Sequence, residues 1–319
     1  MTNASIAGVR ARPAARHAIS DGLFRAFVKA CAVLLLVAAL GILVELVRHS
    51  GLSIDQFGWK FIVSRAWNPV TQEFGALSSI FGTVLSTAIA MLVAVPLSLM
   101  LALFLVELTH PVVSRLVGGA VELLAAIPSI IYGMWGLFVF APFMADHVQP
   151  AVQKVAGPLP LFQGPPMGIG ILTAGIILAL MVLPFITAVM RDVFSMVPAV
   201  IKESAYGMGA TTVEVTRKVS VPYGVQGLIG ACFLGLGRAI GETMAVTFVI
   251  GNNHSISASL FDAGNSIAST LANEFSEAAE PVYLSALMEL GLILFALTFL
   301  IQMIAQLWLG RMRLKTGRT

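Results

Sequence analysis

Six apolar stretches, each long enough to cross a bilayer as a helix, constrain this chain more than any other feature of its sequence. A hydrocarbon core of about 30 Å needs roughly 20 helical residues. We place the stretches near Ala30–Val47, Ile80–Val106, Leu116–Met144, Gly168–Met190, Tyr223–Ile250 and Tyr283–Leu309. Only 11% of the residues are charged, whereas soluble domains carry about 25%. The sequence therefore predicts an all-α polytopic membrane protein with six transmembrane helices, because backbone groups in lipid must be satisfied within helices or closed barrels.

The basic residues are distributed unevenly between the two sides of the predicted helices. Fourteen of the 19 Lys and Arg residues fall on one side, four on the other and one, Arg238, inside a span. The fourteen are Arg10, Arg12, Arg16, Arg25, Lys29, Arg115, Arg191, Lys202, Arg217, Lys218, Arg311, Arg313, Lys315 and Arg318. The positive-inside rule then predicts that both termini are cytoplasmic. No small-residue cleavage site follows the first stretch, so we expect an uncleaved anchor.

The polar segment Lys202–Pro222 lies on the same cytoplasmic side and reads KESAYGMGATTVEVTRKVSVP. Pro198 suits a first helical turn, and Gly207 and Gly209 can supply the left-handed residue that ends a helix. Thr211 and Glu214 have the spacing of a capping box and predict a second short helix, after which Pro222 leads into the fifth span. We expect a bent, two-helix protrusion that could sit in a groove on a partner.

The spacing within this segment resembles the EAA loop of ABC-importer permeases. Glu203-Ser204-Ala205 is followed by three residues, Gly209, nine residues and Val219-Ser220-Val221-Pro222, with Ser for the middle Ala and Val for Ile and Leu. The resemblance implies that this loop, 198–222, docks a separate ATPase subunit. Glu203 and Gly209 are the expected contacts, and Ala205 is expected to allow close approach.

The chain carries no motif for chemistry of its own. It has no G-x-x-x-x-G-K-[ST] run, so we expect ATP to be handled by another polypeptide. It also lacks G-x-S-x-G and H-E-x-x-H, which argues against an intramembrane enzyme. The five histidines are scattered without ligand spacing, so we expect no metal site and no cofactor. Cys31 and Cys232 lie in apolar spans as small hydrophobic residues.

Arg238 and Glu242 stand out because both fall near the middle of the predicted fifth span. Intramembrane charges are costly and mark functional sites by default. At i and i+4 they would share one helix face, while Gly237 and Gly241 form a G-x-x-x-G that favours close helix packing. Two interpretations stay open: a structural ion pair that fixes helix register, or a substrate path in which Arg238 offers its planar fork to an oxyanion.

Several longer segments are similar to the PstC permease family of high-affinity phosphate ABC importers. They are LLAAIPSIIYGMWGLFVFAP (Leu123–Pro142), MRDVF (Met190–Phe194), LGLGRAIGETMAVTFVIGN (Leu234–Asn252), FGALSSIFGT (Phe74–Thr83) and ALMELGLIL (Ala286–Leu294). The likeness implies a type I (MetI-like) permease fold in a bacterial inner membrane. It also implies three partners: a second homologous permease subunit, a cytoplasmic ATPase dimer and a periplasmic phosphate-binding protein. A permease for sulfate or molybdate is the nearest alternative, and an ion-coupled secondary anion carrier is another.

This resemblance also suggests how the chain is organised. We expect a cytoplasmic tail at 1–29, a first transmembrane helix with a periplasmic segment at 30–75, a five-helix importer domain at 76–310 and a tail at 311–319. The outer loop Gly251–Pro281 is acidic, and either a solvated loop or a docking surface for the binding protein would explain it. Glu107, Glu122 and Glu289 fit snorkelling or interhelical hydrogen bonds.

Overall fold

The computed structural model describes residues 14–316, with side chains for residues 21–311. The helices are α1 (Ala14–His49), α2 (Gly51–Phe57), α3 (Lys60–Val63), α4 (Leu77–Leu103), α5 (Pro111–Ala126), α6 (Ser129–Trp135), α7 (Ala141–Phe143), α8 (Gln149–Ala156), α9 (Ile171–Ser195), α10 (Ala199–Gly207), α11 (Thr212–Val215), α12 (Val221–Ile240), α13 (Met244–Val249), α14 (Ile267–Glu274) and α15 (Pro281–Thr316). π-helical turns at Phe104–Leu108, Gly136–Phe140, Met144–Val148 and Thr216–Ser220 extend several of them, and a 3-10 turn spans Pro160–Phe162. No strand occurs among these described residues, so the all-α class is confirmed.

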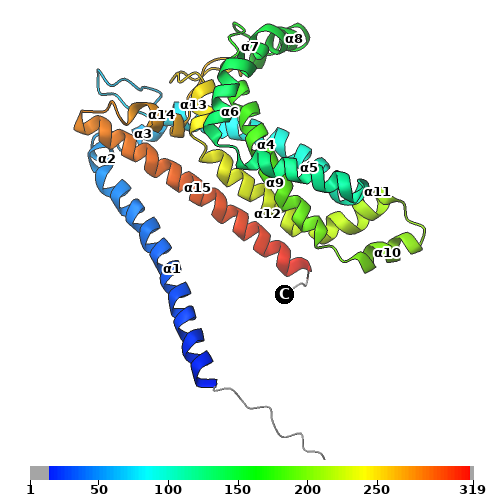
Figure 1. The fold of residues 1–319 in the computed structure, drawn as a ribbon. Coiled ribbons are helices and arrows are strands. Elements are labelled where there is room, and N and C mark those ends of the chain that lie inside the picture. Colours follow the sequence, from blue (N-terminus) through cyan, green and yellow to red (C-terminus); the bar gives the residue numbers. More distant parts are fainter. Residues whose placement is uncertain (1–13, 317–319) are drawn as a thin grey trace, which may run out of the picture. The chain divides into compact units, whose positions relative to one another are not determined.

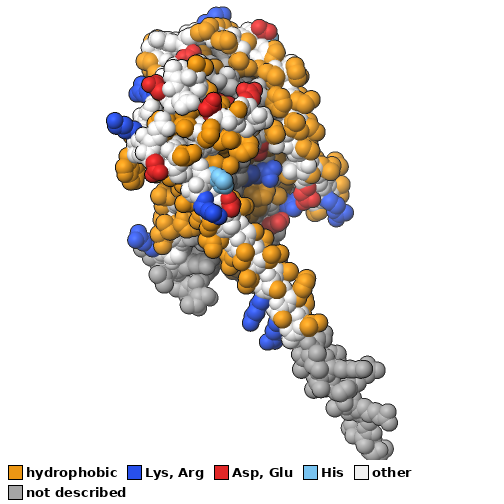
Figure 2. Space-filling model, turned by 90° about the vertical axis from the view of Figure 1, so that its left-hand side faces the viewer, with side chains coloured by type: hydrophobic (Ala, Val, Ile, Leu, Met, Phe, Trp, Pro, Cys, Tyr) orange, Lys and Arg blue, Asp and Glu red, His pale blue; other side chains and the backbone are white. Residues whose placement is uncertain are grey.

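The structure describes only part of the expected tails. Residues 1–13 and 317–319, which include Arg10, Arg12 and Arg318, lie outside the described residues, as do the side chains of Arg16, Arg313 and Lys315. The chain divides into two units at Arg48 and His49. The first unit is essentially α1, a long helix whose apolar side chains are exposed along its length, as suits a helix in lipid (Figure 2).

Six helical runs within the described residues are long and apolar enough to cross a bilayer. They are Asp21–His49, Leu77–Leu108, Ser129–Ala156, Ile171–Ser195, Thr212–Ile240 and Pro281–Arg311. The predicted number of transmembrane helices is therefore confirmed. The boundaries of the third and fifth runs differ from the expected ones, and both differences have a local cause.

The third stretch was expected at Leu116–Met144, and that expectation is wrong. The helix α5 ends at Ala126, and Ile127 and Pro128 are extended, with ψ of 129° and 138°. A proline disfavours the helical region for the residue before it, so the chain breaks there and a new helical run begins at Ser129. Pro96 and Pro184, by contrast, stay inside α4 and α9.

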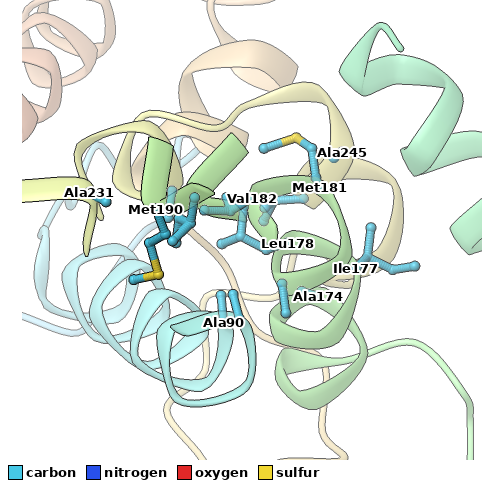
Figure 3. Packing of buried hydrophobic residues seen from close by; sticks show 14 of the residues in the cluster. Ala90, Ala174, Ile177, Leu178, Met181, Val182, Met190, Ala231 and Ala245 are labelled. Atoms are coloured by element: carbon cyan, nitrogen blue, oxygen red, sulfur yellow. The ribbon is translucent and has the colours of Figure 1, made fainter. Parts of the chain in front are cut away.

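The core of the second unit lies where α4, α9, α12 and α13 meet (Figure 3). Ala90, Ala174 and Ala231 are fully buried there. A Cβ added at Gly175 of α9 would come within 2.6 Å of the Ile89 side chain of α4. Small residues let helix backbones approach closely, which is how helices associate without a hydrophobic driving force in lipid. The helices α4 and α9 therefore form a tightly packed pair.

The two ends of the second unit are built differently (Figure 1). One end, the cap, consists of α2, α3, α14 and the first turns of α15, which share a cluster of buried residues that includes Phe61, Phe74 and Leu287. The other end, the loop side, carries α10 and α11 and the last turns of α15. The predicted docking residues and the outer acidic loop thus lie at opposite ends of the bundle.

Candidate functional sites

The segment between α9 and α12 folds as helix, break and helix, as expected. The helix α10 begins after Pro198, and Gly209 adopts φ of +86°, a left-handed conformation that suits glycine. Thr211 caps α11: its Oγ1 accepts from the Glu214 N–H at 3.4 Å, while Glu214 Oε2 accepts from the Thr211 N–H at 3.0 Å. Both the left-handed turn at Gly209 and the capping box are confirmed; Gly207 is instead the last residue of α10.

The predicted docking residues differ in their exposure. Glu203 and Gly209 lie on the surface, next to Met208, which is 84% exposed. Ala205 is only 7% exposed, because it packs inside the loop. In this chain Ala205 therefore shapes the loop rather than offering a surface. The exposed face combines a carboxylate with apolar side chains, a combination that suits a protein partner.

The second helix of the loop is not a separate element. The helices α11 and α12 run on continuously through the π-helical turn Thr216–Ser220, so one helix covers Thr212–Ile240. Pro222 stands inside this run rather than between two helices. A π-helical turn commonly accommodates such a disruption of the helical hydrogen bonds. The helix α11 is therefore the first part of a transmembrane helical run.

Glu107, in the π-helical turn that ends α4, forms hydrogen bonds with this loop. Its Oε1 accepts hydrogen bonds from Lys202 Nζ at 2.7 Å and from Ser220 Oγ at 2.8 Å. The Glu107 side chain is 5% exposed and that of Lys202 is 17% exposed. Of the two explanations kept for Glu107, interhelical hydrogen bonding is the one that applies. Sequence reasoning missed the partners because they lie 95 and 113 residues away.

Arg238 and Glu242 do not share one helix, so the expectation of an i, i+4 pair on one helical face is wrong. The helix α12 ends at Ile240, with Gly241 as its C-cap, and α13 begins at Met244. Glu242 lies in the break, where its Oε1 accepts from the Ala245 N–H at 3.3 Å. Among the described residues, no ion pair joins it to Arg238.

Arg238 lies exposed on the last turns of α12, with its guanidinium carbon 5.6 Å from the centre of the Phe185 ring. Such a contact orients the guanidinium without satisfying its donors. A planar, permanently charged group with free donors at the end of a broken transmembrane helix is suited to binding an oxyanion. This geometry favours the path interpretation over an internal ion pair.

The two glycines of the G-x-x-x-G also differ. A Cβ on Gly237 would come within 2.5 Å of Gln302 Nε2 on α15, whereas Gly241 faces only its own helix, 3.7 Å from the Gly237 carbonyl oxygen. Gly237 thus permits close approach of α15, and Gly241 ends the helix instead. In the described residues no group of three or more His, Cys, Asp or Glu side chains is placed to hold a metal ion.

In the outer loop Gly251–Pro281, the Glu274 side chain is hydrogen-bonded to other residues of the cap end. Its carboxylate accepts from Trp67 Nε1 and Tyr283 Oη, each at 2.6 Å, and lies 2.9 Å from His254 Nε2. Burial alone would raise the pKa of Glu274, but the hydrogen bonds from His254, Tyr283 and Trp67 outweigh it and lower the pKa. Glu277, by contrast, is exposed. A docking surface on this loop would therefore not include Glu274.

Comparison with known proteins agrees with this architecture. Residues 76–314 match the family described as "Binding-protein-dependent transport system inner membrane component". The chain is 53% identical over 306 residues to the phosphate transport system permease protein PstC of Mesorhizobium japonicum, covering 95% of this chain and 94% of that protein. It is 50% identical to PstC of Pasteurella multocida, covering 95% of each.

Solved structures resemble the fold at lower identity. A chain of a bacterial alginate ABC transporter, solved in complex with an alginate pentasaccharide-bound periplasmic protein, has a TM-score of 0.62 at 16% identity and covers 95% of this chain and 98% of its own length. A chain of the inward-facing MetNI methionine ABC transporter has a TM-score of 0.51 at 19% identity, covering 74% and 94%. The type I importer permease fold is confirmed. The chain therefore belongs to the family of binding-protein-dependent transport system inner membrane components, and within it to the PstC permease proteins.

Proposed function

We propose that this chain is a permease subunit of an ATP-driven importer that moves inorganic phosphate across the bacterial inner membrane. The observation that carries the proposal is the identity of 53% to a phosphate transport system permease over almost the whole of both chains. The exposed guanidinium of Arg238 at the helix break supports it, because it supplies the donors that a phosphate oxyanion requires.

The substrate path in this proposal runs along Arg238 and Glu242, at the face that a second, homologous permease subunit covers. Neither residue is paired to the other, so the Arg238 donors remain available to substrate. A lone guanidinium facing lipid would be costly. A partner subunit or a water-filled path that covers it removes this cost. Gly237 holds α12 close to α15 beside this site.

The energy comes from a cytoplasmic ATPase dimer that docks on the loop side through Glu203, Gly209 and their exposed apolar neighbours. The excess of basic residues on that side favours a cytoplasmic loop and cytoplasmic termini. A periplasmic phosphate-binding protein delivers substrate at the cap end. Binding on either side then biases one of two states, because each partner contacts those states differently.

Reconstituted vesicles test the function. The chain is assembled with the second permease subunit and the ATPase, and supplied with the phosphate-binding protein and radiolabelled phosphate. We expect uptake that needs both ATP and the binding protein and persists when ion gradients are collapsed. Uptake that follows an ion gradient without ATP would indicate a secondary carrier. Transport of sulfate or molybdate in preference to phosphate would identify another oxyanion as the substrate.

A further inference from the structure

The end of α4 is joined to the docking loop through one buried carboxylate. Glu107 lies in the π-helical turn Phe104–Leu108, Lys202 lies on α10, and Ser220 lies in the turn that leads into α12. All three meet at the single oxygen Oε1 of Glu107. The end of α4 is thus fixed at one point to both parts of the loop, which lie 95 and 113 residues further along the chain.

The helix α10 itself has few other attachments to the bundle, whereas α11 continues directly into α12. Ala205 is the one buried residue of α10, and its carbonyl is bonded within the loop, to the Ala210 N–H. Among the described residues, the Lys202–Glu107 pair is the one ion pair that links α10 to a transmembrane helical run. Removing one partner of a buried pair is strongly destabilising, because the other group is left buried without compensation. The junction therefore resists opening more than an exposed pair does.

The helix α4 connects Glu107 to the core. It packs along α9 through small residues, and Ser98 Oγ of α4 donates to the Leu183 carbonyl of α9 at 3.0 Å. We propose that Glu107 is a positioning residue for energy coupling. It clamps the docking helix α10 to the end of α4, so that displacement of the loop by the ATPase moves the α4–α9 pair with it. This inference rests on the proposed transport function.

The first test compares Glu107→Gln with Glu122→Gln in assembled, reconstituted complexes. Glu122 also makes a 2.7 Å bond to a basic residue, Arg191, but its side chain is 56% exposed. We expect Glu107→Gln to keep the ATPase bound and hydrolysing ATP, while phosphate moved per ATP falls about fivefold or more, the lower end of typical coupling between sites. Glu122→Gln should match the wild type. A merely structural role would lower the yield of complex without lowering this ratio.

Reversing the pair adds a rescue experiment. The double variant Glu107→Lys with Lys202→Glu restores opposite charges at the junction, so it should recover more of the coupling ratio than either single reversal does. An unchanged ratio in Glu107→Gln, or no recovery in the double variant, would overturn the proposal. If Glu107→Gln does not assemble, Lys202→Gln replaces it and must give the same loss.

A distance measurement separates this inference from the proposed function. Spin labels at Val200 on α10 and Met100 on α4, both exposed, are introduced after Cys31 and Cys232 are replaced. We expect the distance between the labels to stay constant when ATP is added to the wild type and to change in Glu107→Gln. A distance that changes equally in both would overturn the clamp, whichever substrate the wild-type complex transports.

Discussion

Single charged side chains carry most of the functional information in this molecule, and their surroundings separate their roles. Arg238 is exposed, and its guanidinium lies over the Phe185 ring, whereas Glu107 and Glu274 are each held by several donors. A charge that is fully bonded inside the fold stabilises that fold. A charge whose donors remain free can bind a substrate, and among the described residues Arg238 of α12 is the proposed example.

The role of Arg238 can be tested by two substitutions. Arg238→Gln removes the charge, and we expect uptake to fall at least about tenfold, since hydrogen bonds to charged groups contribute about 1.5–3 kcal/mol. Arg238→Lys keeps the charge but loses the planar fork, so an intermediate rate is expected. The measurement is the initial rate of phosphate uptake at equal amounts of assembled complex. Wild-type uptake by Arg238→Gln would show that the guanidinium is not on the path.

Glu274 makes the stability of the cap depend on pH. The pKa of Glu274 is lowered in the folded chain. Its contribution to the free energy of unfolding is therefore present above the pKa of an unfolded glutamate, about 4.3, and is lost as pH falls through the lower folded value. The wild type should therefore melt at a higher temperature than Glu274→Gln at neutral pH, and this difference should shrink below about pH 4.

Melting of the detergent-solubilised chain at a series of pH values measures this effect. The matched control is Glu277→Gln, because Glu277 is exposed in the same loop. Its melting temperature should follow that of the wild type at every pH. An equal pH dependence for both variants would show that Glu274 is not the source of the pH-dependent stability of the cap.

At the scale of elements, hydropathy predicts how many helices cross the membrane but not where they break. The number of spans follows from the apolar runs, but the third run lies at Ser129–Ala156 rather than at Leu116–Met144. The break at Gly241–Thr243 does not follow from them, because the span stays apolar overall despite Arg238 and Glu242, and a glycine is tolerated within a membrane helix. Pro222 has the opposite effect: it suggests the end of a helix, but the π-helical turn Thr216–Ser220 lets the helix continue. Both positions depend on backbone hydrogen bonding, which side-chain patterns report only indirectly.

The loop between α10 and α11 offers a test with a matched pair of glycines. Gly209 has φ of +86°, so Gly209→Ala should cost about 1–2 kcal/mol through backbone strain alone. Gly207 ends the helix α10, and an added Cβ meets nothing within 4 Å at either position. We therefore expect Gly207→Ala to be neutral or to stabilise by up to about 1 kcal/mol.

The readout for these two variants is the amount of ATPase retained on the purified permease. Gly209→Ala should retain less than the wild type, and Gly207→Ala should retain at least as much. Since neither substitution clashes, a loss confined to Gly209→Ala identifies the left-handed turn as the feature the ATPase recognises. If the two variants retain equal amounts of ATPase, the left-handed turn is not required for docking.

At the scale of the whole molecule, the transport direction depends on which end of the bundle faces the cytoplasm. The cap holds the His254–Glu274 network and the loop side holds Lys202, Arg217 and Lys218. Because positively charged segments are retained on the cytoplasmic side, the loop side is expected inside. This orientation also puts the proposed docking face where ATP is available, so the proposed ATPase contact requires the loop side to be cytoplasmic.

Single cysteines decide the orientation. With Cys31 and Cys232 replaced, Val70→Cys reports the cap end and Met196→Cys reports the loop side; the native side chains there are 92% and 67% exposed. A maleimide reagent that cannot cross the inner membrane should label Val70→Cys in intact cells and Met196→Cys only after the membrane is opened, since the reagent reaches only the periplasmic face. The reverse pattern would place the loop outside, where no ATPase could dock on Glu203 and Gly209. Labelling of both sites in intact cells would place the segments 64–76 and 196–211 on the same side of the membrane. An odd number of spans lies between these segments, so this result would contradict the six-span topology.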